Sequence, residues 1–99
     1  MIEITREDNK LILKPEQDLT GDIIEKFREE LSKNLEDESV ELIFDLSSVQ
    51  LIDSTGLALL VASQKTLEEK NKLLTLINVN EEIFDLLRLT HLDRFFNIG

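Results

Sequence analysis

Cysteine is missing from this 99-residue sequence, so disulfides, thiol nucleophiles and thiolate metal sites are excluded. Tryptophan and tyrosine are missing too, and three glycines and one proline mark few turns, so the elements must be inferred from hydrophobic periodicity. No apolar run approaches the ~20 residues that cross a bilayer. The first residues do not resemble a secretion signal. We therefore expect no membrane segment and a cytoplasmic location.

Basic residues are scarce, because eleven stand against twenty-one acidic residues and the net charge is −10. Such a surface repels phosphate backbones and anionic lipid, which argues against nucleic acid and membrane as partners. With 32% charged and 41% hydrophobic residues, the chain has the profile of a soluble globular protein. Its length suits one core of ordinary size, so residues 1–99 are expected to form a single domain.

Short alternating or apolar runs predict strands, and apolar stripes three or four residues apart predict helices. The predicted strands are Ile2–Thr5, Leu11–Leu13, Val40–Leu46 and Leu73–Ile77, with a polar turn at Arg6–Asn9 and a loop at Pro15–Thr20. The predicted helices are a stripe from Ile23 to Leu35, a segment from Thr55 to about Lys70, and one that Asn80 caps and that ends at Leu89. The tail from His91 to Gly99 could form a helical turn and a short strand.

The order of these elements predicts an α/β fold: a single-domain mixed β-sheet flanked by helices, mostly parallel, with an antiparallel N-terminal edge strand. Val40–Leu46 is nearly all apolar at its centre, as in an interior strand covered on both faces. Right-handed crossovers bring the loops after Leu13, Leu46 and Ile77 to one edge of the sheet. We therefore expect Asp18 and Asp53 to lie close together.

Most enzyme classes find no support in the sequence. The single histidine, His91, would have to serve any Ser-His-Asp triad, and no serine lies in a nucleophile elbow. The three glycines, at positions 21, 56 and 99, form no phosphate-binding loop. Acidic clusters are expected by chance among so many carboxylates. We predict no enzyme activity, no cofactor and no metal, and interpret His91 as a solvated or capping residue.

The segment Asp53-Ser54-Thr55-Gly56-Leu57 follows a buried strand and opens an apolar helix. Two interpretations are open. In the first, Asp53 or Ser54 only caps the helix by accepting hydrogen bonds from its first N–H groups. In the second, Ser54 is exposed and phosphorylated, and the phosphate meets the N–H donors of the helix start. Gly56 would then let another backbone approach, and the side chain of Thr55 would turn toward neighbouring structure.

The stretch Asp45–Leu57 resembles the signature of STAS domains, specifically the bacterial anti-sigma factor antagonists. That family has a buried strand, an Asp-Leu-Ser-like turn, and Asp-Ser-Ser/Thr/Ala-Gly-Leu opening a helix. The tail Leu87–Phe96 is similar to the closing segment of the same family. The resemblance covers essentially the whole chain, and the two motifs together make it specific.

The resemblance implies that Ser54 is the phosphoacceptor, and that Asp18 is the family's acidic residue in the loop after the second strand. Asp53, Thr55 and Gly56 would support partner binding or the switch. In that family an anti-sigma factor with serine kinase activity phosphorylates the antagonist. The unphosphorylated form binds the anti-sigma factor and frees a sigma factor, and a phosphatase resets the antagonist.

One loop departs from the family pattern. Where the family has Gly-Glu-Leu/Ile-Asp and a hydroxyl residue three positions later, this chain has Pro15-Glu16-Gln17-Asp18 and Gly21. Alternatives are a STAS module of a larger sensory assembly, a STAS domain that binds a nucleotide or other small ligand, and a receiver-like domain phosphorylated on Asp53. A receiver would need an acidic pair after its first strand and a lysine after its last, and neither is present.

Overall fold

The computed structural model describes residues 2–34 and 41–99, so the predictions made for Leu35 and Val40 lie outside the described residues. In chain order the elements are β1 Ile2–Glu7, β2 Lys10–Pro15, α1 Gly21–Asn34, β3 Glu41–Asp45, α2 Ser54–Glu69, β4 Leu73–Ile77, α3 Glu81–Leu89 and β5 Asn97–Ile98. This order matches the predicted alternation, including the short strand in the tail.

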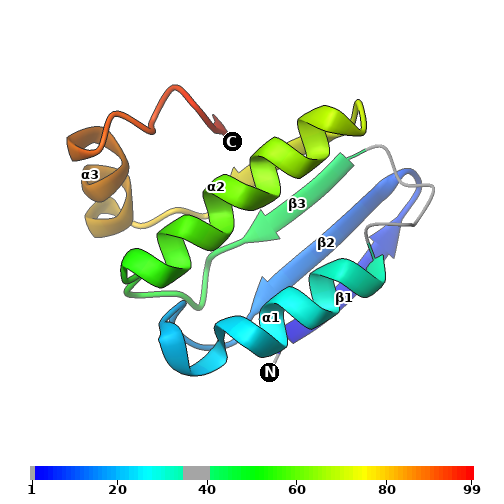
Figure 1. Cartoon of the computed structure of the whole chain (residues 1–99), viewed down its shortest axis with the longest axis horizontal. Coiled ribbons are helices and arrows are strands. Elements are labelled where there is room, and N and C mark those ends of the chain that lie inside the picture. The colour runs from blue at the N-terminus through cyan, green and yellow to red at the C-terminus, as the bar shows by residue number, and fades with distance from the viewer. Residues whose placement is uncertain (1, 35–40) are drawn as a thin grey trace.

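The five strands form one sheet in the order β1-β2-β3-β4-β5. β1 pairs antiparallel with β2, and every later neighbour is parallel. The predicted mixed sheet with an antiparallel edge is therefore confirmed. Because the strand order advances in one direction, right-handed crossovers place their helices on the same face. Figure 1 shows α1 and α2 crossing that face side by side.

Alternate residues of the strands face the helices and form the core. Phe44 of β3 is fully buried, and its ring meets Phe27 of α1 edge to face, with 5.3 Å between the centroids. The other strand residues of this core are Leu11, Leu13, Leu42, Leu74 and Leu76, and the helices add Ile24, Leu31, Leu59, Leu60, Leu67, Ile83 and Leu87. This packing holds the carboxyl edge of the sheet in place.

β3 is an interior strand whose three central residues are buried, which confirms the predicted coverage of both faces. Ile43, on the face opposite Phe44, is 8% exposed but is not part of the helix-packed core. Side chains of the neighbouring strands cover it, since it lies in register between Ile12 and Thr75. On this face Thr75 Oγ1 donates to Glu41 Oε2 at 3.1 Å. An apolar strand centre therefore does not by itself demand two helical layers.

The N-terminal hairpin is tighter than predicted. β1 continues to Glu7, so the turn is only Asp8 and Asn9, and Asp8 takes a left-handed φ of 51°. β2 also runs further, to a buried Pro15 that lies opposite Ile2. Strand pairing across the hairpin overrides the polar character of these residues.

Core truncations should separate buried from exposed positions. Phe44→Ala should lower the free energy of unfolding by about 3–5 kcal/mol and Leu60→Ala by about 2–5 kcal/mol, because both side chains are fully buried. The matched control is Leu73→Ala, at a leucine 63% exposed, which should change it by less than about 0.5 kcal/mol. Urea melts followed by circular dichroism measure all three, and a cost for Leu73→Ala equal to that of Leu60→Ala would contradict this core.

Candidate functional site

The loop between β3 and α2 ends in Asp53, which is the N-cap of α2. Its backbone is extended, with φ −90° and ψ −178°, and its Oδ1 accepts a hydrogen bond from Gly56 N at 2.8 Å. The helix therefore begins at Ser54, one residue earlier than predicted. Ser54 is the first helical residue and Asp53, rather than Ser54, caps the helix.

The second carboxylate oxygen of Asp53 reaches another helix. Asp53 Oδ2 accepts from Gly21 N, the first residue of α1, at 2.9 Å. The N–H groups of Gly56 and then Gly21 hold the pKa of Asp53 below its ordinary value of 3.8. One ionised carboxylate thus joins the starts of α1 and α2, where the helix dipoles favour negative charge.

Asp18 makes a similar connection from the loop after β2 to the loop after β3. Its Oδ1 accepts from Gln50 N at 2.8 Å and from Leu51 N at 3.1 Å, so the loop after β2 holds the loop after β3. Leu19 adds backbone bonds, accepting from Asp53 N at 3.2 Å and donating to Leu51 O at 3.1 Å. The structure therefore brings Asp18 and Asp53 to the same edge of the sheet, across 35 positions of sequence.

Gly56 lies where these loops touch the first turn of α2. A Cβ added to Gly56 would be 2.2 Å from Leu19 O, a distance that no real side chain tolerates. The close backbone is thus the chain's own loop after β2. Gly56 is required because this loop packs directly against the helix start.

Ser54 and Thr55 are both exposed on this edge. The prediction that Thr55 turns toward neighbouring structure is wrong, because the second position of the helix faces solvent here. That a phosphate on Ser54 would meet N–H donors of the helix start stays a prediction. Gly56 N and Gly21 N already donate to Asp53, so a phosphate on Ser54 would lie beside an occupied carboxylate.

A shallow groove runs from Ser54 along the outer side of α2. It has a volume of about 410 Å³ and is lined mainly by small and apolar side chains. The lining residues are Ser54, Leu57, Ala58, Val61, Ala62, Lys65 and Leu92. The candidate phosphoacceptor therefore sits at one end of an apolar surface.

Asn80 is the site residue whose full role the sequence did not reveal. Its Oδ1 caps α3 by accepting from Ile83 N at 2.8 Å, as predicted. Its Nδ2 also donates to Val49 O at 3.2 Å and to Gln50 O at 3.3 Å. The only signal in the sequence was the choice of asparagine, a cap residue that carries a donor as well as an acceptor.

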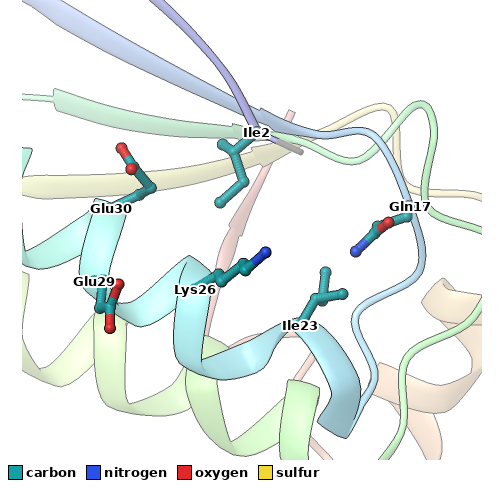
Figure 2. Close-up of a pocket in the computed structure, with 6 residues that line it drawn as sticks. All are labelled: Ile2, Gln17, Ile23, Lys26, Glu29 and Glu30. Carbon is teal, nitrogen blue, oxygen red and sulfur yellow. The ribbon is translucent and has the colours of Figure 1, made fainter.

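A second groove, shown in Figure 2, lies between α1 and the start of β1, away from Ser54. Its volume is about 360 Å³, and it is lined by Ile2, Gln17, Ile23, Lys26, Glu29 and Glu30. Two carboxylates beside one lysine suit nucleotide phosphates poorly. This groove therefore lends no support to the nucleotide-binding alternative.

Two further findings concern residues 2–34 and 41–99. Within these ranges no three His, Asp or Glu side chains are grouped so that they could hold a metal ion. No helix in the same ranges is long and apolar enough to span a bilayer. His91 is exposed, with a left-handed φ of 61°, and follows Thr90, the C-cap of α3.

The sequence matches the model of the STAS domain over residues 1–99. The chain belongs to the STAS domain family. Its fold superposes on the Thermotoga maritima protein TM1081 with a TM-score of 0.92 and 26% identity, over 98% of this chain and 84% of that one. An anti-sigma factor antagonist from Mycobacterium paratuberculosis gives a TM-score of 0.87 at 18% identity, over 99% and 83% of the two chains.

The phosphorylated form of the Bacillus cell fate determinant SpoIIAA has the same fold, with a TM-score of 0.77 at 14% identity. The likeness spans 100% of this chain and 91% of that one. The resemblance inferred from Asp45–Leu57 is thereby confirmed at the level of the family. The STAS fold places the loops described above at the carboxyl edge of its parallel strands.

The contact between Gly56 and Leu19 gives a steric prediction. Gly56→Ala should lower the free energy of unfolding by about 1–3 kcal/mol, because the new methyl group must push the Leu19 backbone away. Gly21→Ala is the matched control, since its Cβ would have no neighbour nearer than 3.9 Å, and should change stability by less than about 1 kcal/mol. Denaturant melts compare the two variants, and equal effects would refute the close packing.

The double cap gives a pH prediction. Because the folded-state pKa of Asp53 is lowered from 3.8, its ionised form stabilises the fold above that value. The stabilisation is lost as the pH falls below ~4. Asp53→Asn should therefore show a shallower loss of stability over this acid range than wild type, whereas Ser54→Ala should follow the wild-type profile. Thermal melts as a function of pH measure this, and identical slopes for Asp53→Asn and wild type would count against the double cap.

Proposed function

We propose that this STAS domain is an anti-sigma factor antagonist switched by phosphorylation of Ser54. The observation that carries the proposal is the position of Ser54, which is exposed at the first turn of α2 and at one end of the apolar groove. The carboxylates of Asp18 and Asp53 hold the surrounding loops by accepting hydrogen bonds from backbone amides. The protein acts by binding rather than catalysis, and it needs no cofactor.

In the unphosphorylated state the groove along α2 receives the anti-sigma factor, which releases its sigma factor. The anti-sigma factor is also the serine kinase, and it transfers the γ-phosphoryl group of ATP to Ser54 Oγ, releasing ADP and a proton. A phosphatase hydrolyses the ester with water and restores the serine. Membership of the STAS family supports these partners and a cytoplasmic setting, and the acidic surface disfavours nucleic acid.

The switch acts through charge at the edge of the groove. Phosphorylation adds about −1.5 to −2 charges. The new charge lies next to ionised Asp53, whose hydrogen bonds already engage Gly56 N and Gly21 N. A partner that covers the groove must then remove a poorly compensated charge from water, which is costly. Binding is lost while the core, remote from Ser54, stays folded.

The receiver-like alternative conflicts with the role of Asp53. Both oxygens of this carboxylate accept backbone hydrogen bonds that cap α1 and α2, so an acyl phosphate there would break two helix caps. Ser54 is not a helix cap, so a phosphate on its hydroxyl would break neither cap. A STAS module within a larger sensory assembly stays an alternative for the biological setting, and it uses the same surface.

The proposal predicts opposite behaviour for two variants of Ser54. Ser54→Asp should bind the anti-sigma factor of the same organism at least about tenfold more weakly than wild type, because it places a carboxylate at the groove. Ser54→Ala should bind like wild type and resist phosphorylation by that kinase and ATP. Calorimetric titration and phosphosite mapping by mass spectrometry measure the two effects.

Ser48→Asp is the matched charge control, because Ser48 is exposed in the same connecting loop but does not line the groove. It should bind like wild type. Circular dichroism should show all variants folded. If Ser54→Asp binds with wild-type affinity and no phosphate is found on Ser54 after incubation with the kinase, the proposal is wrong. The segment would then serve only to begin α2.

A further inference from the structure

The backbone from Val49 to Leu51 is held from two sides, and we name this arrangement the connector clamp. On one side Asp18 Oδ1 accepts from the amides of Gln50 and Leu51. On the other side Asn80 Nδ2 donates to the carbonyls of Val49 and Gln50. In this clamp the Asp18 side chain binds the amides of the segment, and the Asn80 side chain binds its carbonyls.

The two sides of the clamp come from different parts of the fold. Asp18 lies in the loop between β2 and α1, whereas Asn80 lies between β4 and α3. The clamped segment ends two residues before Asp53, the cap of α2. Val49 is 1% exposed and anchors the start of the segment in the core, whereas Gln50 is exposed and Leu51 is 56% exposed. Burial therefore restrains Val49, and the hydrogen bonds restrain the backbone of Gln50 and Leu51.

We propose that Asn80 is a positioning residue for Ser54, holding the connector so that the serine hydroxyl is presented in one geometry. The inference rests on the function proposed above and adds a residue to it. Phosphoryl transfer depends on close alignment of the attacking oxygen, and small misplacements cost large factors in rate. Asn80 would act through the backbone and does not itself touch the reacting groups.

The test separates the two functions of the Asn80 side chain. Asn80→Ser keeps an oxygen that can cap α3 at Ile83 N, since serine and asparagine are comparable N-caps, but it removes the amide donor to Val49 O and Gln50 O. Asn80→Asp does the same with an added charge. If both variants agree, the effect comes from the lost donor and not from charge.

Amide hydrogen exchange on the isolated protein reads out the clamp directly. In both variants the amides of Gln50 and Leu51 should exchange about five- to tenfold faster, the factor expected for one lost net hydrogen bond. The amide of Ile83 should keep its wild-type rate because the cap is retained. Asn97→Asp is the matched control, since it removes an amide donor to Thr75 on the helix-free face and should leave Gln50 and Leu51 unchanged.

Kinetics with the anti-sigma kinase and ATP read out the consequence for Ser54. We expect kcat for phosphorylation of Asn80→Ser to fall about tenfold, with KM for the antagonist within about twofold of wild type, because the groove along α2 is intact. A residue of merely structural importance would change stability without this separation of kcat from KM. Asn97→Asp should be phosphorylated at the wild-type rate.

The outcomes distinguish the failure of each idea. Wild-type exchange at Gln50 and Leu51 in both variants would overturn the clamp, whatever the kinase does. Faster exchange with an unchanged kcat would show that the clamp does not position Ser54, and would overturn the proposal. If wild type itself is never phosphorylated, the proposed function fails and the positioning role falls with it, while the exchange rates still decide whether Asn80 restrains the connector.

Discussion

The Asp53 carboxylate is the contact on which the rest of the site depends. Its two oxygens accept amides from the first turns of two helices, at 2.8 Å from Gly56 and 2.9 Å from Gly21. Without it, both helices would begin with unsatisfied N–H groups on the same edge of the sheet. Because the carboxylate is ionised and sits at two positive helix ends, it is stabilised where it lies. Ser54 is the residue after Asp53, so the cap also fixes where Ser54 lies.

Around this carboxylate, other side chains also hydrogen-bond to the backbone of a neighbouring loop. The loops at the carboxyl edge bury Leu19, Leu46 and Val49 in the core, and side chains with two hydrogen-bonding atoms join the exposed parts of these loops. Asp18 and Asp53 each hold the other's loop, and Asn80 adds a third element through its amide. The result is an edge joined by hydrogen bonds between side chains and backbone, on which Ser54 and Thr55 are exposed.

The single helical layer explains how such a small domain offers two different surfaces. The helix-covered face carries the core around Phe44 and the groove along α2. The opposite face is closed by short polar contacts, such as Thr75 with Glu41 and Asn97. A charge added at Ser54 therefore alters one surface while the core and the far face keep their contacts. The switch proposed for Ser54, which changes binding without unfolding, requires this separation.

The sequence by itself determined the order of the elements, the mixed sheet and the family, because hydrophobic periodicity and the Asp53–Leu57 segment are local signals. It also indicated that Asp18 and Asp53 would meet. Only the tertiary structure decided that Asp53 caps two helices, that Thr55 is exposed, and that Asn80 reaches the connector. The contacts of Asp53 and Asn80 join backbone groups of segments more than thirty residues apart, and nearly every residue carries the same backbone groups, so these contacts leave no trace in the sequence.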